Sequence, residues 1–440
     1  MMNLRQLPLA VALTAACVLP AHAQSLVELY DSARGFDASY QSAKSAYEAN
    51  LYRAEQAKAG LLPSAGLAMG VNRANISSGT AAFDRGTYGN QTATLSASQP
   101  LYRPANVATA AQGKKSVDLA QQQLRVADQD LILRVSQAYF DVLASDDNLN
   151  FVKAQKSAVS EQLAAAKRTF EVGTSTITDT REAQARFDLT MAQEIAAEND
   201  LRVKKLALDQ LTGKTMATPK ALQLPLVIAP IAPDDVNVWV TQSEGLSPAV
   251  QQAQLGLEVA QLETQKAQAG HKPTLDLVGS YNVTQNNGTP SVSTDYRTNA
   301  ASVGLSLNLP LFAGFATQNR IRETLALEDK ARSDLDAAKR GVAQATRTAF
   351  FGVDSLLGQV KALEAAEASS QSALDATKLG YQVGVRINID VLNAQTALFD
   401  TKAKLAKARY DLLLARLKLR QATGSLNADD LNTVNALLAK

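Results

Sequence analysis

The segment GYQVGVRINIDVLNAQ (residues 380–395) lies between two long, proline-free stretches rich in Ala, Leu, Lys and Gln, which we expect to be helical. A similar segment, TFEVGTSTITDTREAQ (residues 169–184), occurs further up the chain. Each carries a glycine and, after it, an aspartate at the start of the next expected helix. Glycine supplies the backbone freedom that a tight reversal needs, and aspartate is favoured at helix starts. The two segments predict two helical hairpins of similar design.

These hairpins belong to a tandem duplication of nearly the whole chain. Matching residues are 210 positions apart early in the repeat, as for Pro63 and Pro273, and 211 apart later, as for Asp179 and Asp390. Self-similarity at a fixed separation indicates a repeated structural unit. The expected segments are a signal peptide at 1–23, a first repeat at 24–213, a linker at 214–245, a second repeat at 246–424 and a C-terminal segment at 425–440.

The N-terminus has the pattern of a secretory signal peptide. Arg5 precedes an apolar run at residues 7–20, and the small-residue string Ala21-His22-Ala23 follows it. The run is too short to cross a bilayer, so we expect cleavage after Ala23. Cys17 lacks the leucine usually found three positions before a lipidated cysteine, which favours simple cleavage over lipidation. The mature protein then leaves the cytoplasm without a cysteine.

Composition narrows the function classes. The formal net charge is +2, and His271 is the one histidine beyond the signal peptide. These residues offer little for a transition-metal site or a nucleophile–base pair, and no pair of carboxylates is placed by any pattern other than the repeated turns. The balanced charge, without a basic run, argues against nucleic-acid binding. We predict no enzymatic activity, no cofactor or metal, and no nucleic-acid partner.

Each repeat also contains a pair of segments in which apolar residues alternate with small or polar ones. The stretch SVGLSLNLPL (residues 302–311) shows this pattern, and TATLSASQPL (residues 92–101) is its counterpart. A period of two predicts strands, and we expect hairpins at about 64–101 and 274–311. Strands of about ten residues with one apolar face suit a tilted membrane-spanning sheet.

The expected strands are too few to close a membrane barrel. The smallest single-chain barrels need about eight strands, and an open edge in lipid leaves backbone groups unpaired. We therefore expect an oligomer. Two chains would give a tight barrel of about eight strands, and three would give about twelve strands with room for an opening.

The remaining segments have helical periodicity. Leucines recur every seven residues at 398, 405, 412 and 419, and Leu124, Leu131 and Ala138 repeat in the same way. Such a repeat predicts coiled-coil packing. The run from residue 105 to residue 170 would form a helix on the order of 100 Å long.

In order along the chain, several short motifs resemble those of the TolC family of outer-membrane channel proteins. They are AKAGLLPSAGL before the first strand, PLYRPA and PLFAG after the second and fourth, the turns FEVGTSTITD and YQVGVRINIDVLNAQ, and the helix ends LTGK and ATGSL. The resemblance covers essentially the whole mature chain.

This resemblance implies a membrane α+β fold in the outer membrane of a Gram-negative bacterium. Each subunit of a homotrimer would give four strands to a twelve-stranded barrel in outer-membrane lipid, and long helices to a periplasmic α-barrel. A periplasmic adaptor and an inner-membrane pump or ABC exporter would complete an efflux or type I secretion system. The linker and the C-terminal segment would form a belt around the α-barrel. The family's exported substrate is chosen mainly by the pump, so the resemblance names neither a drug nor a protein.

The same resemblance assigns roles to the two turns, at about 170–179 and 381–390. Tyr381 and Arg386 match the closing contacts of the family's tip, with Asp179 as a partner. Asp390 matches the first member of an acidic ring that constricts the pore, whereas Asn393 replaces the second. The turns that contain Gly173 and Gly384 would dock the adaptor.

Simpler roles for these residues remain open. Asp179 and Asp390 could cap their helices, Arg386 could be a solvated charge, and Tyr381 could be a packing aromatic. For the whole protein, the alternative is a periplasmic adaptor or another secreted coiled-coil protein, which would share the heptads but lack paired amphipathic hairpins.

Overall fold

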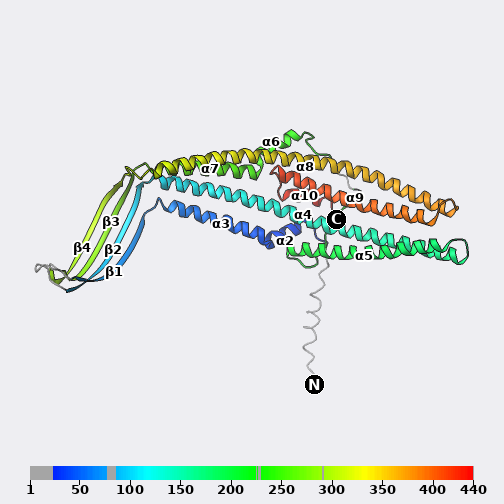
Figure 1. The fold of residues 1–440 in the computed structure, drawn as a ribbon, viewed down its shortest axis with the longest axis horizontal. Helices are drawn as coiled ribbons and strands as arrows, with labels where there is room; N and C mark the ends of the chain where they lie inside the picture. The colour runs from blue at the N-terminus through cyan, green and yellow to red at the C-terminus, as the bar shows by residue number, and fades with distance from the viewer. Residues whose placement is uncertain (1–22, 77–85, 224, 226–228, 290–291, 440) are drawn as a thin grey trace, which may run out of the picture. The chain divides into compact units, whose positions relative to one another are not determined.

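The computed structural model describes residues 23–76, 86–223, 225, 229–289 and 292–439 (Figure 1). Apart from Ala23, the expected signal peptide, including Cys17, lies outside these residues. The elements run in the order α2 (Leu26–Phe36), α3 (Ala38–Ala59), β1 (Ser64–Ile76), β2 (Gly86–Tyr102), α4 (Pro104–Glu171), α5 (Ile177–Thr212), α6 (Val236–Leu246), α7 (Pro248–Ala269), β3 (Thr274–Thr289), β4 (Val292–Asn308), α8 (Ala316–Gln382), α9 (Asn388–Ala422) and α10 (Asp429–Asn435). None of the helices in this described part is both long and apolar enough to cross a membrane.

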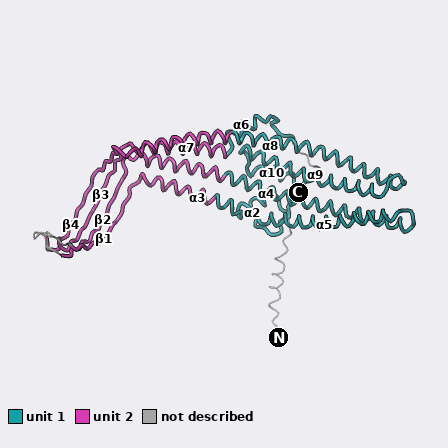
Figure 2. The backbone as a smooth tube through the Cα atoms, in the orientation of Figure 1, with its two compact units in different colours: residues 1–43, 125–247, 340–440 teal, residues 44–124, 248–339 magenta. Residues whose placement is uncertain are grey.

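The chain divides into two compact units, which do not correspond to the two sequence repeats (Figure 2). Unit 1 comprises residues 1–43, 125–247 and 340–440, and unit 2 comprises residues 44–124 and 248–339. Both repeats contribute to each unit. The strands all lie in unit 2, and the two helical turns lie in unit 1.

Unit 2 contains an antiparallel sheet with the strand order β1-β2-β3-β4. The two hairpins share one register: Leu67 lies opposite Leu95 in the first, and Leu277 lies opposite Leu305 in the second. Leu277 and Leu305 lie 210 positions after Leu67 and Leu95, respectively. The duplication seen in the sequence is therefore also a duplication of strand pairing.

The alternating sequence gives the sheet two different faces, because directly opposed residues point to the same side. One row across the four strands is apolar and consists of Leu67, Leu95, Tyr281 and Ala301. The adjacent row is small and polar and consists of Gly66, Ser96, Ser280 and Ser302. Many of the apolar side chains are exposed, including Met69, Val71, Val303 and Leu307.

Unit 1 contains α5 and α9 together with the parts of α4 and α8 that lead into the two turns, from residues 125 and 340 onward. The heptad leucines at 398, 405, 412 and 419 are all buried, as the seven-residue repeat predicts. Leu405 and Leu412 pack with Phe350, Val353 and Val360 of α8, with the side chain of Trp239 against the same cluster. At the far end, Val159 and Leu163 of α4 pack with Ala183 of α5 and Leu392 of α9. Burial of these apolar rows holds the hairpins side by side.

Candidate gate at the hairpin tips

The two helical hairpins end in the same kind of turn. Gly173 and Gly384 adopt φ values of 77° and 80°, in the left-handed region that favours glycine. In each turn, the residue after the glycine donates its backbone N–H to a carbonyl near the end of the preceding helix. Thr174 donates to the Thr169 carbonyl at 2.9 Å, and Val385 donates to the Gly380 carbonyl at 2.8 Å. The two turns lie at the same end of the helices in unit 1 (Figure 1).

Asp179 stabilises the start of α5. Its carboxylate accepts hydrogen bonds from the Ser175 hydroxyl at 2.8 Å and from the backbone N–H and hydroxyl of Thr176 at 3.1 and 2.9 Å. Its own N–H donates to the Thr176 Oγ1 atom at 3.2 Å. Thr176 is thus the N-cap and Asp179 the third helical residue of a capping box. Asp179 therefore caps α5, as the simpler interpretation predicts, but it does so from the third helical position, and the N-cap residue is Thr176.

These bonds also set the charge of Asp179. Partial burial alone would raise the pKa of its carboxyl, but the hydrogen bonds from Ser175 and Thr176 outweigh this and hold the pKa below the ordinary value. The carboxylate is therefore ionised at neutral pH, and it accepts its hydrogen bonds from residues of the same turn.

Arg386 lies beside Asp390 in the same turn. Its Nη1 atom is 3.8 Å from the Asp390 Oδ2 atom, an i,i+4 ion pair. The Arg386 side chain, 60% exposed, passes over Gly380, where an added Cβ would meet its Cγ atom at 2.8 Å. The fold within one chain therefore brings Arg386 to Asp390 rather than to Asp179. A surface ion pair of this kind contributes little stability, about 0–1 kcal/mol.

Tyr381 lies half-buried at the end of α8. It packs against a cluster of Leu374, Val391 and Leu398, together with Ala394. Its ring thus joins the last turn of α8 to the first turns of α9. Within one chain this is the packing role that the sequence left open for it.

Sequence reasoning missed Asn388, the first residue of α9. It is only 2% exposed, and its Nδ2 atom donates to the backbone carbonyl of Asp179 at 3.3 Å. Its Oδ1 atom accepts a hydrogen bond from the side-chain amide of Gln162 in α4. Asn388 therefore ties the second-repeat turn to both helices of the first hairpin. A comparison of the two repeats contains a signal for Asn388: its counterpart in the first repeat, Ile177, is apolar, so the two turns differ at this position.

Further polar contacts join the same helices behind the turns. Arg186 of α5 donates to the Oδ1 atom of Asn393 in α9 at 2.9 Å, and Gln155 of α4 donates to Thr396 of α9 at 3.5 Å. Asn393 is the position at which the resemblance predicts that an acidic ring would lack its second member. Here its amide serves as a partner for an arginine of the other repeat.

The turns expose apolar side chains at their outer ends. Val385 is 78% exposed, and Val172, Val383 and Ile387 are exposed as well. Exposed apolar residues gathered at one place are typical of a surface that another protein covers.

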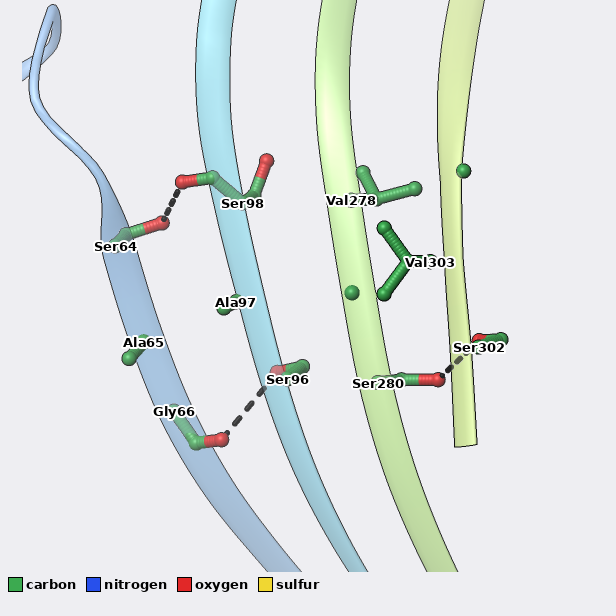
Figure 3. Close-up of a pocket in the computed structure, with 12 residues that line it drawn as sticks. Ser64, Ala65, Gly66, Ser96, Ala97, Ser98, Val278, Ser280, Ser302 and Val303 are labelled. Atoms are coloured by element: carbon green, nitrogen blue, oxygen red, sulfur yellow. Dashed lines mark hydrogen bonds between the residues drawn. The ribbon is translucent and has the colours of Figure 1, made fainter. Parts of the chain in front are cut away.

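The sheet in unit 2 carries a second feature, a hollow of about 590 Å³ lined by small residues (Figure 3). Ser64 donates to the Ser98 carbonyl at 3.4 Å, Ser96 donates to the Gly66 carbonyl at 3.4 Å, and the hydroxyls of Ser280 and Ser302 lie 2.9 Å apart. These bonds satisfy the hydroxyls across neighbouring strands. The hollow is a shallow surface of the sheet, and Ser, Ala, Gly and Val residues line it.

Comparison with known families decides the identity of the fold. A family model described as outer membrane efflux protein matches the chain twice, at residues 29–214 and 239–425. The chain belongs to this family. The two matches begin and end at corresponding positions of the duplication, and together they span most of the chain.

Individual relatives agree with this assignment. The chain is 33% identical to outer membrane protein TolC of Vibrio cholerae over 94% of each chain, and 30% identical to TolC of Escherichia coli over 95% of this chain and 86% of the other. It is 30% identical to the alkaline protease secretion protein AprF of Pseudomonas aeruginosa, over 94% of this chain and 88% of the other.

Solved structures show the same fold. The Vibrio cholerae outer membrane protein VceC matches with a TM-score of 0.78 at 19% identity, covering 91% of this chain and 96% of that one. The Campylobacter jejuni CmeC outer membrane channel matches with a TM-score of 0.79 at 15% identity, covering 93% and 89%.

The family membership confirms three predictions from the sequence: the family, the fold class with its internal duplication, and the location in the outer membrane. The protein is an outer-membrane exit duct of the kind used in efflux and type I secretion. The family consists of outer-membrane proteins, which decides against the alternative of a periplasmic adaptor.

Proposed function

We propose that this protein works as a homotrimer, a passive conduit with no chemistry of its own and with a gate at the hairpin tips. The observation that carries the proposal is the four-stranded sheet, which has exposed apolar residues on one face and, among the described residues, no strand along its two outer edges. In lipid, every backbone group needs a partner, so such a sheet requires further strands. Three copies would supply about twelve, enough for a barrel with an opening.

The segments outside the repeats would form a belt around the helices. Linker residues pair with the C-terminal segment: the Gln223 N–H donates to the Leu437 carbonyl at 2.9 Å, and the Ala439 N–H donates to the Ala221 carbonyl at 2.8 Å. This pairing closes the end of the chain against the linker between its repeats. It supports the division into two repeats, a linker at 214–245 and a C-terminal segment at 425–440.

The gate would consist of Tyr381, Arg386 and Asp179, with Asp390 forming a ring around the axis. In a trimer, three copies of Asp390 would face one another, and like charges at close range repel one another and attract cations. Arg386, 3.8 Å from Asp390, would offset part of that repulsion. The exposed side chains of Arg386 and Val385 remain available to a neighbouring copy.

A periplasmic adaptor would dock on the tip turns around Gly173 and Gly384. The exposed valines that flank these glycines offer an apolar surface at the end of each hairpin. An inner-membrane pump or ABC exporter would then deliver a drug or a protein into the duct.

The proposal is tested by isolating the outer membrane and comparing heated and unheated samples on a denaturing gel. We expect a trimer that dissociates on heating, and the purified trimer should give discrete single-channel currents in a planar bilayer. A monomer in the soluble fraction would refute the conduit, and a trimer without currents would refute its opening under these conditions. Cells that lack the protein should lose either drug resistance or a secreted protein, which identifies the cargo class.

A further inference from the structure

In the part of the chain that the structure describes, no strand pairs with the outer edge of β1 or with the outer edge of β4. Edge strands with exposed apolar side chains are templates for pairing with another chain, and Val303 on β4 is 82% exposed. The chain already contains one pair of strands that joins the two repeats, β2 with β3, which we call the β2–β3 seam. Because the repeats are similar, this pair indicates how an outer edge would pair with another copy.

The β2–β3 seam is the template. In it, Ser98 lies opposite Val278, and Ser96 lies opposite Ser280. Moving β2 forward by the 210-residue repeat gives β4, and moving β3 back by the same number gives β1. Since the registers within the two hairpins are already identical at this separation, the same shift applied to the seam places Asn308 opposite Ala68.

The end of β4 fits this arrangement. β2 continues as a strand to Tyr102, where β3 pairs with it, whereas β4 ends at Asn308. The counterparts of the last four β2 residues, at 309–312, pair with no strand in the described part of the chain. The end of β2 pairs with β3, and β1 is the counterpart of β3 in the first repeat. Pairing with β1 of another copy would therefore give residues 309–312 the corresponding partner strand.

The two seams differ in their side chains. Thr94 donates to the Oδ1 atom of Asn282 at 3.2 Å across the β2–β3 seam. Arg103 donates from its Nε atom to the Asp276 Oδ1 atom at 2.7 Å and from its Nη2 atom to the Asp276 Oδ2 atom. After the 210-residue shift, the first pair becomes Gly304 and Asn72, and the second becomes Ala313 and Gly66. Neither of the shifted pairs can form the corresponding side-chain link.

We infer that β4 of one copy pairs with β1 of the next in the register of the β2–β3 seam shifted by one repeat, and that main-chain bonds hold this seam without the two side-chain links. The inference rests on the proposed trimer and adds the register of the seam between copies and the absence of the two side-chain links from it.

The register is tested by cross-linking, since the only cysteine, Cys17, lies in the expected signal peptide. The matched variant carries Ala68→Cys and Asn308→Cys, and the control carries Ala68→Cys and Ser306→Cys, shifted by two residues on the same face. Directly opposed residues lie within the range of a disulfide, whereas diagonal ones lie about 7–8 Å apart. Within one chain the outer strands are separated by about 14 Å, so any bridge joins two copies.

After mild oxidation of outer membranes, we expect covalent dimers and trimers from the matched variant only. Heat-sensitive trimers in which the shifted pair cross-links, or neither pair does, would overturn the register while the trimeric duct stands. Absence of any oligomer in either variant would overturn the proposed trimer and this inference with it.

The missing links are tested at Gly304, where an added Cβ meets nothing within 4 Å. Gly304→Thr would recreate, opposite Asn72, the pair that Thr94 makes with Asn282, and Gly304→Val is a control of the same shape without the hydroxyl. We expect the trimer of Gly304→Thr to dissociate at a higher temperature than that of Gly304→Val. Equal temperatures for the two variants would overturn the inferred opposition of residues 304 and 72.

Discussion

The side-chain amide of Asn388 donates to the backbone carbonyl of Asp179 at 3.3 Å, and so joins the turn of the second repeat to that of the first. The same side chain accepts a hydrogen bond from Gln162. A buried amide with both of its ends satisfied fixes the relative position of the groups it joins. Any movement that separates α9 from α4 and α5 at the tip has to break these bonds.

Replacing Asn388 therefore loosens the tip. Asn388→Ala leaves the Gln162 amide and the Asp179 carbonyl without this partner, which we expect to cost about 1–3 kcal/mol of unfolding free energy. It should also raise single-channel conductance in planar bilayers. Asn393→Ala is the control, because its bond to Arg186 is exposed and should matter less. Equal conductance in Asn388→Ala and the unmodified protein would contradict a role in closure.

Arg386→Ser gives the second turn the residue that the first turn has at Ser175. If Arg386 contributes to the closed tip of the trimer, this variant should open the pore and raise single-channel conductance. Stability of the isolated chain should change by no more than about 1 kcal/mol, because the bond to Asp390 is exposed. A pore as narrow as that of the unmodified protein would count against Arg386 as part of the gate.

Much of the fold could be predicted from the sequence, because its signals are periodic and repeated. The alternation around Leu95 and Leu305 predicts strands, and the heptad through Leu405 and Leu412 predicts buried helix faces. The capping box was also within reach, since Thr176 stands three residues before Asp179, the spacing of such a motif.

The contacts of Asn388 could not be predicted in the same way. Its burial depends on where α4 and α5 lie beside α9, and no local pattern sets that distance. Likewise, the family resemblance names Asp179 as a partner of Arg386, whereas within one chain the turn brings Arg386 to Asp390, four residues further on.

Asp390→Ala should reduce the cation preference of the channel. In the proposed trimer, three copies of Asp390 around one axis would create a negative potential at the constriction, and their removal would leave Arg386 unopposed. Reversal potentials measured across a salt gradient give the preference directly. An unchanged preference for cations would show that the ring lies elsewhere.

Acid should weaken the start of α5 through Asp179. Because the folded protein lowers the pKa of this carboxyl below its ordinary value of 3.8, the ionised form stabilises the fold. That stabilisation is fully present well above pH 3.8 and is lost as the pH falls through the lower, folded pKa. Hydrogen exchange at residues 176–180 should therefore increase at acid pH, and Asp179→Ala should show the faster exchange at neutral pH too. Exchange in Asp179→Ala that matched the unmodified protein at neutral pH would contradict the cap.

The glycine of the second turn can be separated from ordinary helix effects by a matched pair of variants. Gly384 has a φ of 80° and open space around it, so Gly384→Ala should lower stability by about 1 kcal/mol through backbone strain alone. Gly358 lies within α8, also with nothing within 4 Å of an added Cβ, and Gly358→Ala should raise stability by up to about 1 kcal/mol because alanine favours the helix. Urea unfolding of the two variants should therefore shift in opposite directions. A shift in the same direction would mean that the turn at residue 384 relaxes to a conformation that alanine accepts, and that its left-handed glycine is not needed for the reversal.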